Sequence, residues 1–173
     1  RYARNNPLRF IDPLGLDIAI VENGPTEGNP FGHTAGAVTN SGVFSEGNDT
    51  PPGSSLDDYL YRQSSRRDTS VTVIDTTPEQ DRAFLDAMRA SRGRPLGRLT
   101  DNCTSRVNDA LDAAGIPNDW RPDNIPGGTG SRAEDAGGTT QEIPMGSGRG
   151  GIGLGQFEPG GVSSGGLGGG PLG

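Results

Sequence analysis

Apolar residues in the first half of the chain come in short runs that have the length of β-strands. The runs cover residues 17–21, 33–39, 43–45 and 70–75, and the last of them, SVTVID, is the cleanest. Runs of this length that are rich in β-branched residues and bounded by turn residues are typical of strands. The pattern therefore predicts four strands.

The residues between the second and third runs indicate a hairpin. Asn40, Ser41 and Gly42 form a turn signal of the kind that joins two antiparallel strands. A two-residue loop made of Asn40 and Ser41 would pair Thr39 with Gly42. This pairing sets the expected register of the two strands.

A helix start is marked by a capping sequence after the fourth strand. Thr77 is suited to cap the helix, Pro78 to the first helical position, and Gln80 completes a capping box. An apolar face follows, and Gly93 ends the segment. The residues of that face are Phe84, Leu85 and Met88.

The most regular helical stripe comes next. It begins at Asp101 or Asn102 and runs to Ala114, and a Gly-Ile-Pro sequence then stops it. Apolar positions recur with helical spacing at Cys103, Val107, Ala110, Leu111 and Ala114. A shorter segment, residues 56–63 with Ser55 as its cap, is expected to form one or two helical turns.

Residues 137–173 differ in composition from the rest of the chain. They hold 16 of the 30 glycines in 37 positions. A segment of this composition buries too little apolar surface to offset the conformational entropy lost when the chain is ordered. We therefore predict a folded domain over residues 17–136 and a disordered Gly-rich, low-complexity tail over residues 137–173. The order of elements indicates the α+β class, with a small antiparallel sheet packed with two or three helices.

Charge and composition exclude several classes of protein. Residues 17–136 carry 11 Arg against 19 acidic residues, a net charge of −8, so no nucleic-acid partner is expected. No apolar run approaches the roughly 18 residues of a transmembrane segment. One His and one Cys exclude an internal disulfide and a multi-histidine or thiolate metal site, and we expect no metal or other cofactor. The basic pair Arg66 and Arg67 beside Asp68 is interpreted as a solvated turn and not as a phosphate site.

The first sixteen residues, RYARNNPLRFIDPLGL, contain a specific motif. They resemble the end of the Rhs/YD-repeat core domain, whose pattern is Tyr-x-Arg-Asn-Asn-Pro followed by Asp-Pro-x-Gly. In that family the core forms a β-shell cocoon, and an aspartyl self-cleavage frees the segment that follows. The resemblance implies an autocleavage motif at Asp12, Pro13, Gly15 and Leu16, with the scissile bond after Leu16.

The Rhs resemblance also implies a biological setting. Residues 1–16 are then the end of the Rhs core, and the segment from Asp17 onward is a secreted toxin. Such a toxin is delivered into the cytoplasm or periplasm of a target cell. The implied partners are the Rhs core cocoon of the parent protein and a cognate immunity protein, and the released domain is expected to be a monomer.

The one His and the one Cys are the candidate catalytic residues. Cys103 falls in the first turn of its predicted helix, where unpaired N–H groups and the helix dipole stabilise a thiolate. His33 falls at the start of a predicted strand. An imidazole that takes the thiol proton, beside helix N–H groups that stabilise an oxyanion, is the arrangement a cysteine nucleophile needs.

The order of these two residues resembles the permuted papain-like enzymes, the NlpC-type peptidases and the lecithin:retinol acyltransferase-like group. The matching residues are Gly32-His33-Thr34-Ala35, Asn102-Cys103-Thr104 and the end of the helix at Leu111, Ala114, Gly115 and Ile116. Members of this group act as amidases, peptidases or acyltransferases. The resemblance implies a cysteine-dependent hydrolase or acyltransferase that acts on peptidoglycan or on a protein or lipid of the target cell.

The papain-like group usually has a third polar residue on the strand after the His. In the register set by the two-residue hairpin, His33 lies opposite Asn48. A shift of one residue places it opposite Asp49 instead, and Glu46 is a diagonal neighbour. We favour Asn48 as the third catalytic residue.

Alternatives from other classes stay open at this point. A cofactor-using toxin such as an ADP-ribosyltransferase needs an Arg and a Glu, and Arg62 and Glu79 are present without a recognisable arrangement. A non-catalytic delivery segment needs neither. Cys103 also fits a purely structural role, because it lies on the apolar stripe of its helix.

Overall fold

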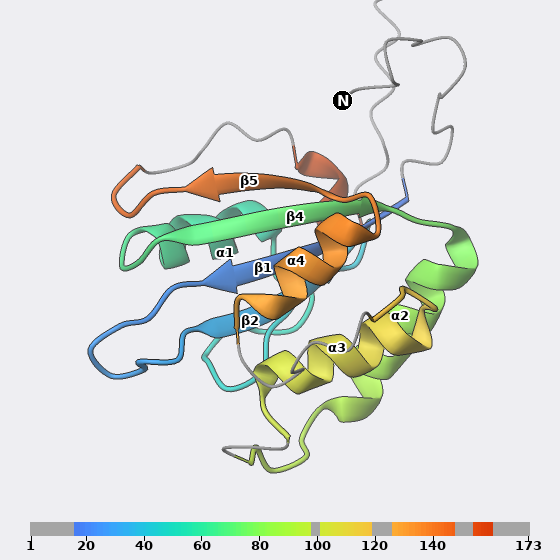
Figure 1. The fold of residues 1–173 in the computed structure, drawn as a ribbon, viewed down its shortest axis with the longest axis horizontal. Coiled ribbons are helices and arrows are strands. Elements are labelled where there is room, and N and C mark those ends of the chain that lie inside the picture. Colours follow the sequence, from blue (N-terminus) through green and yellow to red (C-terminus); the bar gives the residue numbers. More distant parts are fainter. Residues whose placement is uncertain (1–15, 98–100, 119–125, 148–153, 161–173) are drawn as a thin grey trace, which may run out of the picture.

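A five-stranded antiparallel sheet forms the centre of the molecule in the computed structural model, which describes residues 16–97, 101–118, 126–147 and 154–160 (Figure 1). The strand order is β3-β2-β1-β4-β5, and every pair is antiparallel. The strands are β1 (Asp17–Asn23), β2 (His33–Val38), β3 (Gly42–Phe44), β4 (Thr69–Asp75) and β5 (Thr139–Ile143). The predicted α+β class is confirmed.

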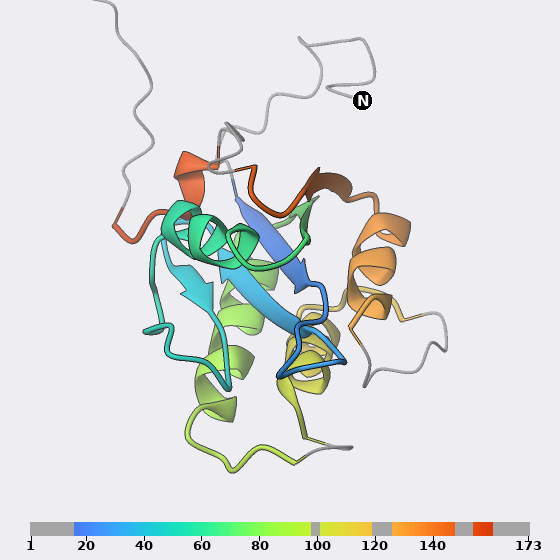
Figure 2. The same cartoon turned by 90° about the vertical axis from the view of Figure 1, so that its left-hand side faces the viewer.

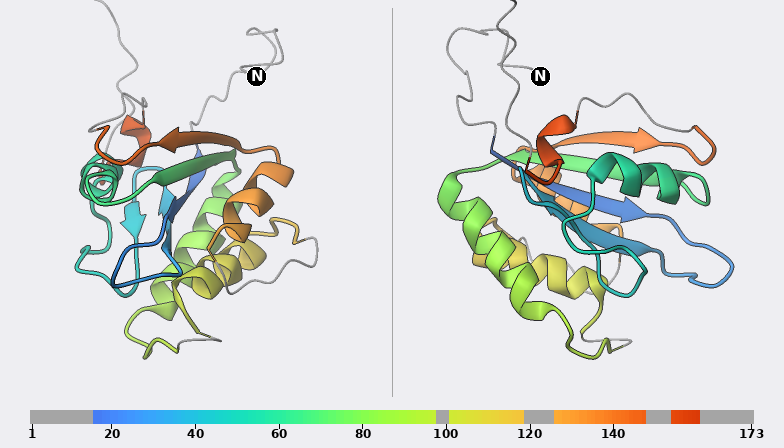
Figure 3. Two further views of the ribbon diagram at one scale, coloured as in Figure 1. Left: turned by 60° about the vertical axis from the view of Figure 1, so that its left-hand side comes forward. Right: turned by 180° about the vertical axis from the view of Figure 1, so that it is seen from behind.

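Helices cover both faces of the sheet, as Figures 2 and 3 show. One face carries three helices: α2 (Pro78–Ser91), α3 (Cys103–Ala113) and α4 (Gly128–Asp135). The other carries α1 (Leu56–Ser64) and the 3-10 turn η2 (Gly155–Phe157). No helix within the described ranges is long and apolar enough to cross a membrane.

Side chains of the central strand alternate between the two faces, because successive residues of a strand point to opposite sides. In β1, Ile18 and Ile20 are buried against the α2, α3 and α4 face. Ala19 and Val21 are buried against α1 on the other face. Both faces of the central strand are therefore core.

The helix starts follow the predicted capping sequences. Thr77 accepts a hydrogen bond from the N–H of Gln80, whose side chain accepts one from the N–H of Thr77. Asn102 and Ser105 form the same reciprocal pair at the start of α3. Ser55 caps α1. These local signals decide where three of the helices begin.

The predicted two-residue hairpin is wrong by one residue. Val38, and not Thr39, pairs with Gly42, so three residues connect the strands. Asn40 adopts a positive φ of 57°, which Asn tolerates better than most residues. The expected register, with His33 opposite Asn48, is therefore also wrong. Across its other neighbour, β1, His33 pairs with Asn23.

The predicted end of the folded domain at residue 136 is too early. Within the expected tail, residues 139–143 form β5 and pair with β4. Leu154 and Phe157 are buried against the α1 face of the sheet. The helix α4 and the strand β5 have no counterpart in the sequence-based prediction.

Candidate active site

The candidate residues gather at one end of the sheet. There β1 ends at Asn23, β2 begins at His33, β4 begins at Thr69 and α3 begins at Cys103. Asn23 pairs with both His33 and Thr69 across the sheet. The ends of three neighbouring strands and the start of one helix therefore meet at the same end of the sheet.

The imidazole of His33 is anchored through one of its two ring nitrogens. Its Nε2 lies 2.7 Å from Ser45 Oγ and 3.3 Å from Asn48 Nδ2, and Asn48 Nδ2 donates to Ser45 Oγ at 2.7 Å. The other nitrogen, Nδ1, has no hydrogen-bond partner among the described residues. The ring is held at Nε2 and open at Nδ1.

Behind Ser45 the polar contacts continue into the protein. Ser45 Oγ lies 3.4 Å from the hydroxyl of Tyr59, which accepts a hydrogen bond of 3.0 Å from Asn23 Nδ2. Thr69 Oγ1 donates to Asn23 Oδ1 at 3.1 Å. Burial raises the pKa of Tyr59, although hydrogen bonds from Ser45 and Asn23 oppose this. The imidazole thus rests on a connected set of buried side chains drawn from β1, β4 and α1.

Burial controls the charge of the imidazole. Desolvation, and then the positive charge of Arg67, lower the pKa of His33 from 6.5 to about 4. A buried group that titrates in this direction favours its neutral form. His33 is therefore neutral at pH 7 and able to accept a proton.

Cys103 is the first residue of α3 and is only partly buried, unlike the rest of the apolar stripe. The cap at Asn102 binds the N–H of Ser105, which leaves the first-turn N–H groups of Cys103 and Thr104 without an intrahelical acceptor. These groups lie beside the thiol. They are in the position where an oxyanion would be stabilised.

Contacts between neighbours bring Cys103 to the His33 end of β2. Thr104 Oγ1 lies 3.0 Å from Thr34 Oγ1, so the residues that follow Cys103 and His33 touch each other. Because side chains alternate along β2, Thr34 faces α3 and His33 faces α1. In the described part of the chain, the thiol has one hydrogen-bond contact, Thr104 Oγ1 at 4.0 Å. Cys103 and His33 thus lie at the same strand end but approach it from different faces.

Of the three candidates for the third polar residue, one contacts the imidazole. Asn48 does so, and its Oδ1 is fixed by the N–H of Thr50 at 3.0 Å. Glu46 instead forms an ion pair with Arg106 at 3.4 Å. Asp49 is exposed.

Sequence reasoning missed Ser45, which makes the shortest contact with the imidazole. In the observed register Gly36 pairs with Phe44, so continuing the ladder places Ser45 opposite Ala35, on the face that His33 shares. The correct hairpin length would have identified it.

The prediction of a solvated turn at the basic pair is wrong for one of its residues. Arg66 is exposed, as expected. Arg67 is half-buried and donates hydrogen bonds to Gln63 Oε1 and to the carbonyl oxygen of Gly24. Arg67 therefore belongs to the site region.

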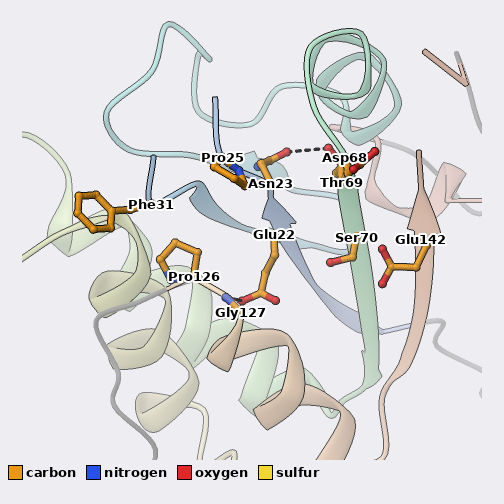
Figure 4. A pocket seen from close by; sticks show the side chains of 11 residues that line it. Glu22, Asn23, Pro25, Phe31, Asp68, Thr69, Ser70, Pro126, Gly127 and Glu142 are labelled. Carbon is orange, nitrogen blue, oxygen red and sulfur yellow. Dashed lines mark hydrogen bonds between the residues drawn. The ribbon is translucent and has the colours of Figure 1, made fainter. Parts of the chain in front are cut away.

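A cavity of about 260 Å³ opens between the end of β1, the start of β4 and the start of α4 (Figure 4). Glu22, Asp68 and Glu142 contribute carboxylates to its lining, and Phe31 forms an exposed wall. The carboxylate of Glu22 accepts a hydrogen bond of 2.7 Å from the N–H of Gly127. The cavity adjoins the candidate site at Asn23 and offers space for part of a substrate.

The predicted autocleavage motif falls mostly outside the described residues, which exclude Asp12, Pro13 and Gly15. Leu16 is described, and its carbonyl oxygen accepts a hydrogen bond of 3.1 Å from the N–H of Thr76. The N–H of Asp17 donates to Thr39 Oγ1 at 2.8 Å. The expected scissile bond thus lies at the point where β1 begins.

The pair expected for an ADP-ribosyltransferase is separated by the sheet. Arg62 lies on α1 and Glu79 on α2, and these helices cover opposite faces. They cannot bind one cofactor together.

Comparison with models of protein families, with curated proteins and with solved structures finds no match.

Proposed function

We propose that the domain beginning at Asp17 is a toxin released from an Rhs protein, and that it acts as a cysteine-dependent hydrolase or acyltransferase. Cys103 is the nucleophile, His33 the base, and Asn48 with Ser45 orients the base. The observation that carries this proposal is the imidazole held at Nε2 and free of partners at Nδ1, at the strand end where the helix of the partly buried Cys103 begins.

The chemistry proceeds in two halves. Nδ1 of His33 takes the thiol proton as the Cys103 sulfur attacks the acyl carbon, and the first-turn N–H groups of α3 bind the oxyanion. The imidazolium then gives its proton to the leaving amine or alcohol, which departs and leaves a thioester. Water or a second nucleophile attacks the thioester after losing a proton to the imidazole, and the thiol is restored.

The neutral imidazole fixes when the proton moves. Because the pKa of His33 is about 4, the ring is neutral at pH 7 and carries a proton on only one of its two nitrogens. The proton is therefore transferred during the attack, as in general base catalysis, and not stored beforehand as an imidazolium. When Nε2 donates its proton to Ser45 Oγ, the lone pair of Nδ1 is directed outward.

Ser45 is a second candidate nucleophile, since its Oγ lies 2.7 Å from Nε2. Its hydroxyl also contacts Asn48 and Tyr59, and the residue is buried. A carbonyl group has no approach to an oxygen that is surrounded in this way. We therefore assign Ser45 to positioning the imidazole.

Mutation separates these roles. Residues 17–173 are expressed without an immunity protein, in cytoplasmic and periplasm-directed forms, and growth inhibition is measured. Cys103→Ala should abolish toxicity, His33→Ala should nearly abolish it, and the double variant should be hardly worse than either. Ser45→Ala should weaken toxicity without abolishing it, because the imidazole loses its shortest hydrogen bond but keeps the contact with Asn48.

Ser65→Ala is the matched control, because this exposed hydroxyl only donates to the carbonyl oxygen of Arg62. Circular dichroism confirms that each variant folds. A folded Cys103→Ala protein with full toxicity in either compartment would end the cysteine proposal. Abolition by Ser45→Ala together with full activity of Cys103→Ala would establish the serine instead.

A further inference from the structure

Arg67 is a half-buried cation without a counter-ion among the described residues. Its Nε and Nη2 donate to Gln63 Oε1 at 3.0 and 2.6 Å, and its Nη1 donates to the carbonyl oxygen of Gly24 at 3.2 Å. All these acceptors are neutral. The neighbouring Asp68 instead accepts a hydrogen bond from the N–H of Met145.

Two arginines of the described residues are fully buried, Arg106 and Arg132, and both are neutralised. Arg106 forms ion pairs with Asp101 at 2.7 Å and with Glu46 at 3.4 Å. Arg132 forms one with Asp112. A buried charge is costly unless it is paired, so the unpaired state of Arg67 requires an explanation.

The hydrogen-bonding capacity of Arg67 is also incomplete. A guanidinium has five N–H donors, and the described residues take three of them. One N–H remains on each terminal nitrogen. Two donors on a planar group are what a carboxylate binds in a bidentate manner.

Position links Arg67 to the candidate active site. Gly24, whose carbonyl oxygen it binds, follows Asn23, the residue that pairs with His33. The charge of Arg67 contributes, after desolvation, to lowering the pKa of His33. The guanidinium therefore lies beside the strand end that carries His33.

We propose that Arg67 binds an anionic group of the substrate, a carboxylate next to the bond that Cys103 attacks. The role of this carboxylate in the reaction rests on the proposed function, in which Cys103 is the nucleophile. Gln63 and Gly24 hold the guanidinium in place from two sides, and the incoming carboxylate supplies the missing counter-ion. The substrate class is then an acyl compound with a free carboxylate close to the reacting carbonyl.

A pair of alkylating reagents tests the site without knowledge of the substrate. Iodoacetate carries a carboxylate and iodoacetamide is its neutral analogue, and Cys103 is the one cysteine that either can modify. The full chain is treated with each reagent, and the two rates are followed by mass spectrometry. We expect Arg67→Met and Arg67→Gln to lower the ratio of the iodoacetate rate to the iodoacetamide rate about fivefold, and Arg67→Lys to lower it less.

Arg66→Met is the matched control, because it removes the same charge from an exposed neighbouring position. Its ratio should equal that of the unmodified sequence. An unchanged ratio in folded Arg67→Met or Arg67→Gln would overturn the proposal, as would an equal fall in Arg66→Met. If toxicity survives Cys103→Ala, only the proposed cysteine chemistry is wrong. The alkylation ratio tests the anion site at Arg67 independently of toxicity.

Discussion

At the scale of single residues, His33 as the proposed base combines two demands that normally conflict. A base must be accessible to the proton it takes, yet it must also be held still. The structure separates these demands between the two nitrogens of one ring, since Ser45 and Asn48 hold Nε2 while Nδ1 stays open. The cost of this arrangement is a buried ring that resists protonation.

That cost predicts a specific loss of stability in acid. The pKa of His33 is about 4 in the folded protein and near 6.5 when unfolded, so the unfolded chain binds more protons between these values. The free energy of unfolding should therefore fall by about 2 kcal/mol from this group between about pH 7.5 and about pH 5. The contribution is fully present above the unfolded value and lost as the pH drops toward 4.

Urea denaturation at a series of pH values measures this effect, with His33→Gln as the comparison because its side chain does not titrate. In the His33→Gln variant, the free energy of unfolding should not show the fall that the imidazole contributes between about pH 7.5 and about pH 5. If both proteins show the same pH slope, the imidazole is not held neutral by its surroundings.

Residue chemistry was partly predictable from the sequence. Cys103 and His33 stand out because each is the one residue of its type in the chain. The expectation of Asn48 rests on a register that is wrong, and Asn48 reaches the imidazole because residues 46–49, after β3, form bends. Ser45 and Arg67 depend on the hairpin length and on long-range packing, which no local pattern encodes.

At the scale of elements, close packing of α2 on the sheet depends on a missing side chain. A Cβ placed on Gly36 of β2 would lie 2.6 Å from Cζ of Phe84, a fully buried ring. Gly36→Ala should therefore lower the free energy of unfolding by about 1–3 kcal/mol, as overpacked cores do. Thermal and urea unfolding measure the change.

Gly28→Ala is the matched control, because a Cβ there meets nothing within 4 Å. Combining Gly36→Ala with Phe84→Leu should recover part of the loss, since the smaller side chain gives space. Equal stability of Gly36→Ala and Gly28→Ala would show that α2 moves away from the strand without cost.

Elements differ in how far the sequence reveals them. The helices α2 and α3 begin at local capping boxes and carry apolar stripes, so both were predictable. The helix α4 begins at Gly128, and its N-cap residue, Gly127, provides no side-chain hydrogen bond. It is held by Arg132, which binds carbonyl oxygens of Asn108, Ile116 and Pro117. Contacts over such distances in sequence cannot be inferred from a local pattern.

At the scale of the whole molecule, the C-terminal region is part of the fold. A chain ending after Gly138 lacks β5 and the buried side chains of Leu154 and Phe157. The loss of Phe157 alone should cost about 3–5 kcal/mol, so this truncation should unfold the domain and abolish toxicity. Circular dichroism and the growth assay measure both effects.

A chain ending after Gly160 is the comparison, because Gly160 makes the last described contact with the domain, to the carbonyl oxygen of Asn40. It should keep its stability and toxicity. Full toxicity of the shorter chain would show that β5 and Phe157 are dispensable.

The Rhs resemblance leads to a prediction about release from the parent protein. Cleavage after Leu16 should leave Asp17 as the new terminus, and Asp12→Asn should block it because a carboxylate must handle the proton of water. The cut would spare β1, which begins at Asp17. N-terminal sequencing of the released fragment checks the position, with exposed Asp75→Asn as a control. A cut elsewhere removes the argument for delivery.

The contact between η2 and the start of β1 has a consequence for synthesis on the ribosome. Gln156 reaches the carboxylate of Asp17, and the N–H of Asn40 binds the carbonyl oxygen of Gln156. The first strand therefore leaves the ribosome long before the residues that cover its end exist. Since folding waits for such long-range contacts, we expect the nascent domain to stay incompletely folded until Gln156 and Phe157 have left the ribosome.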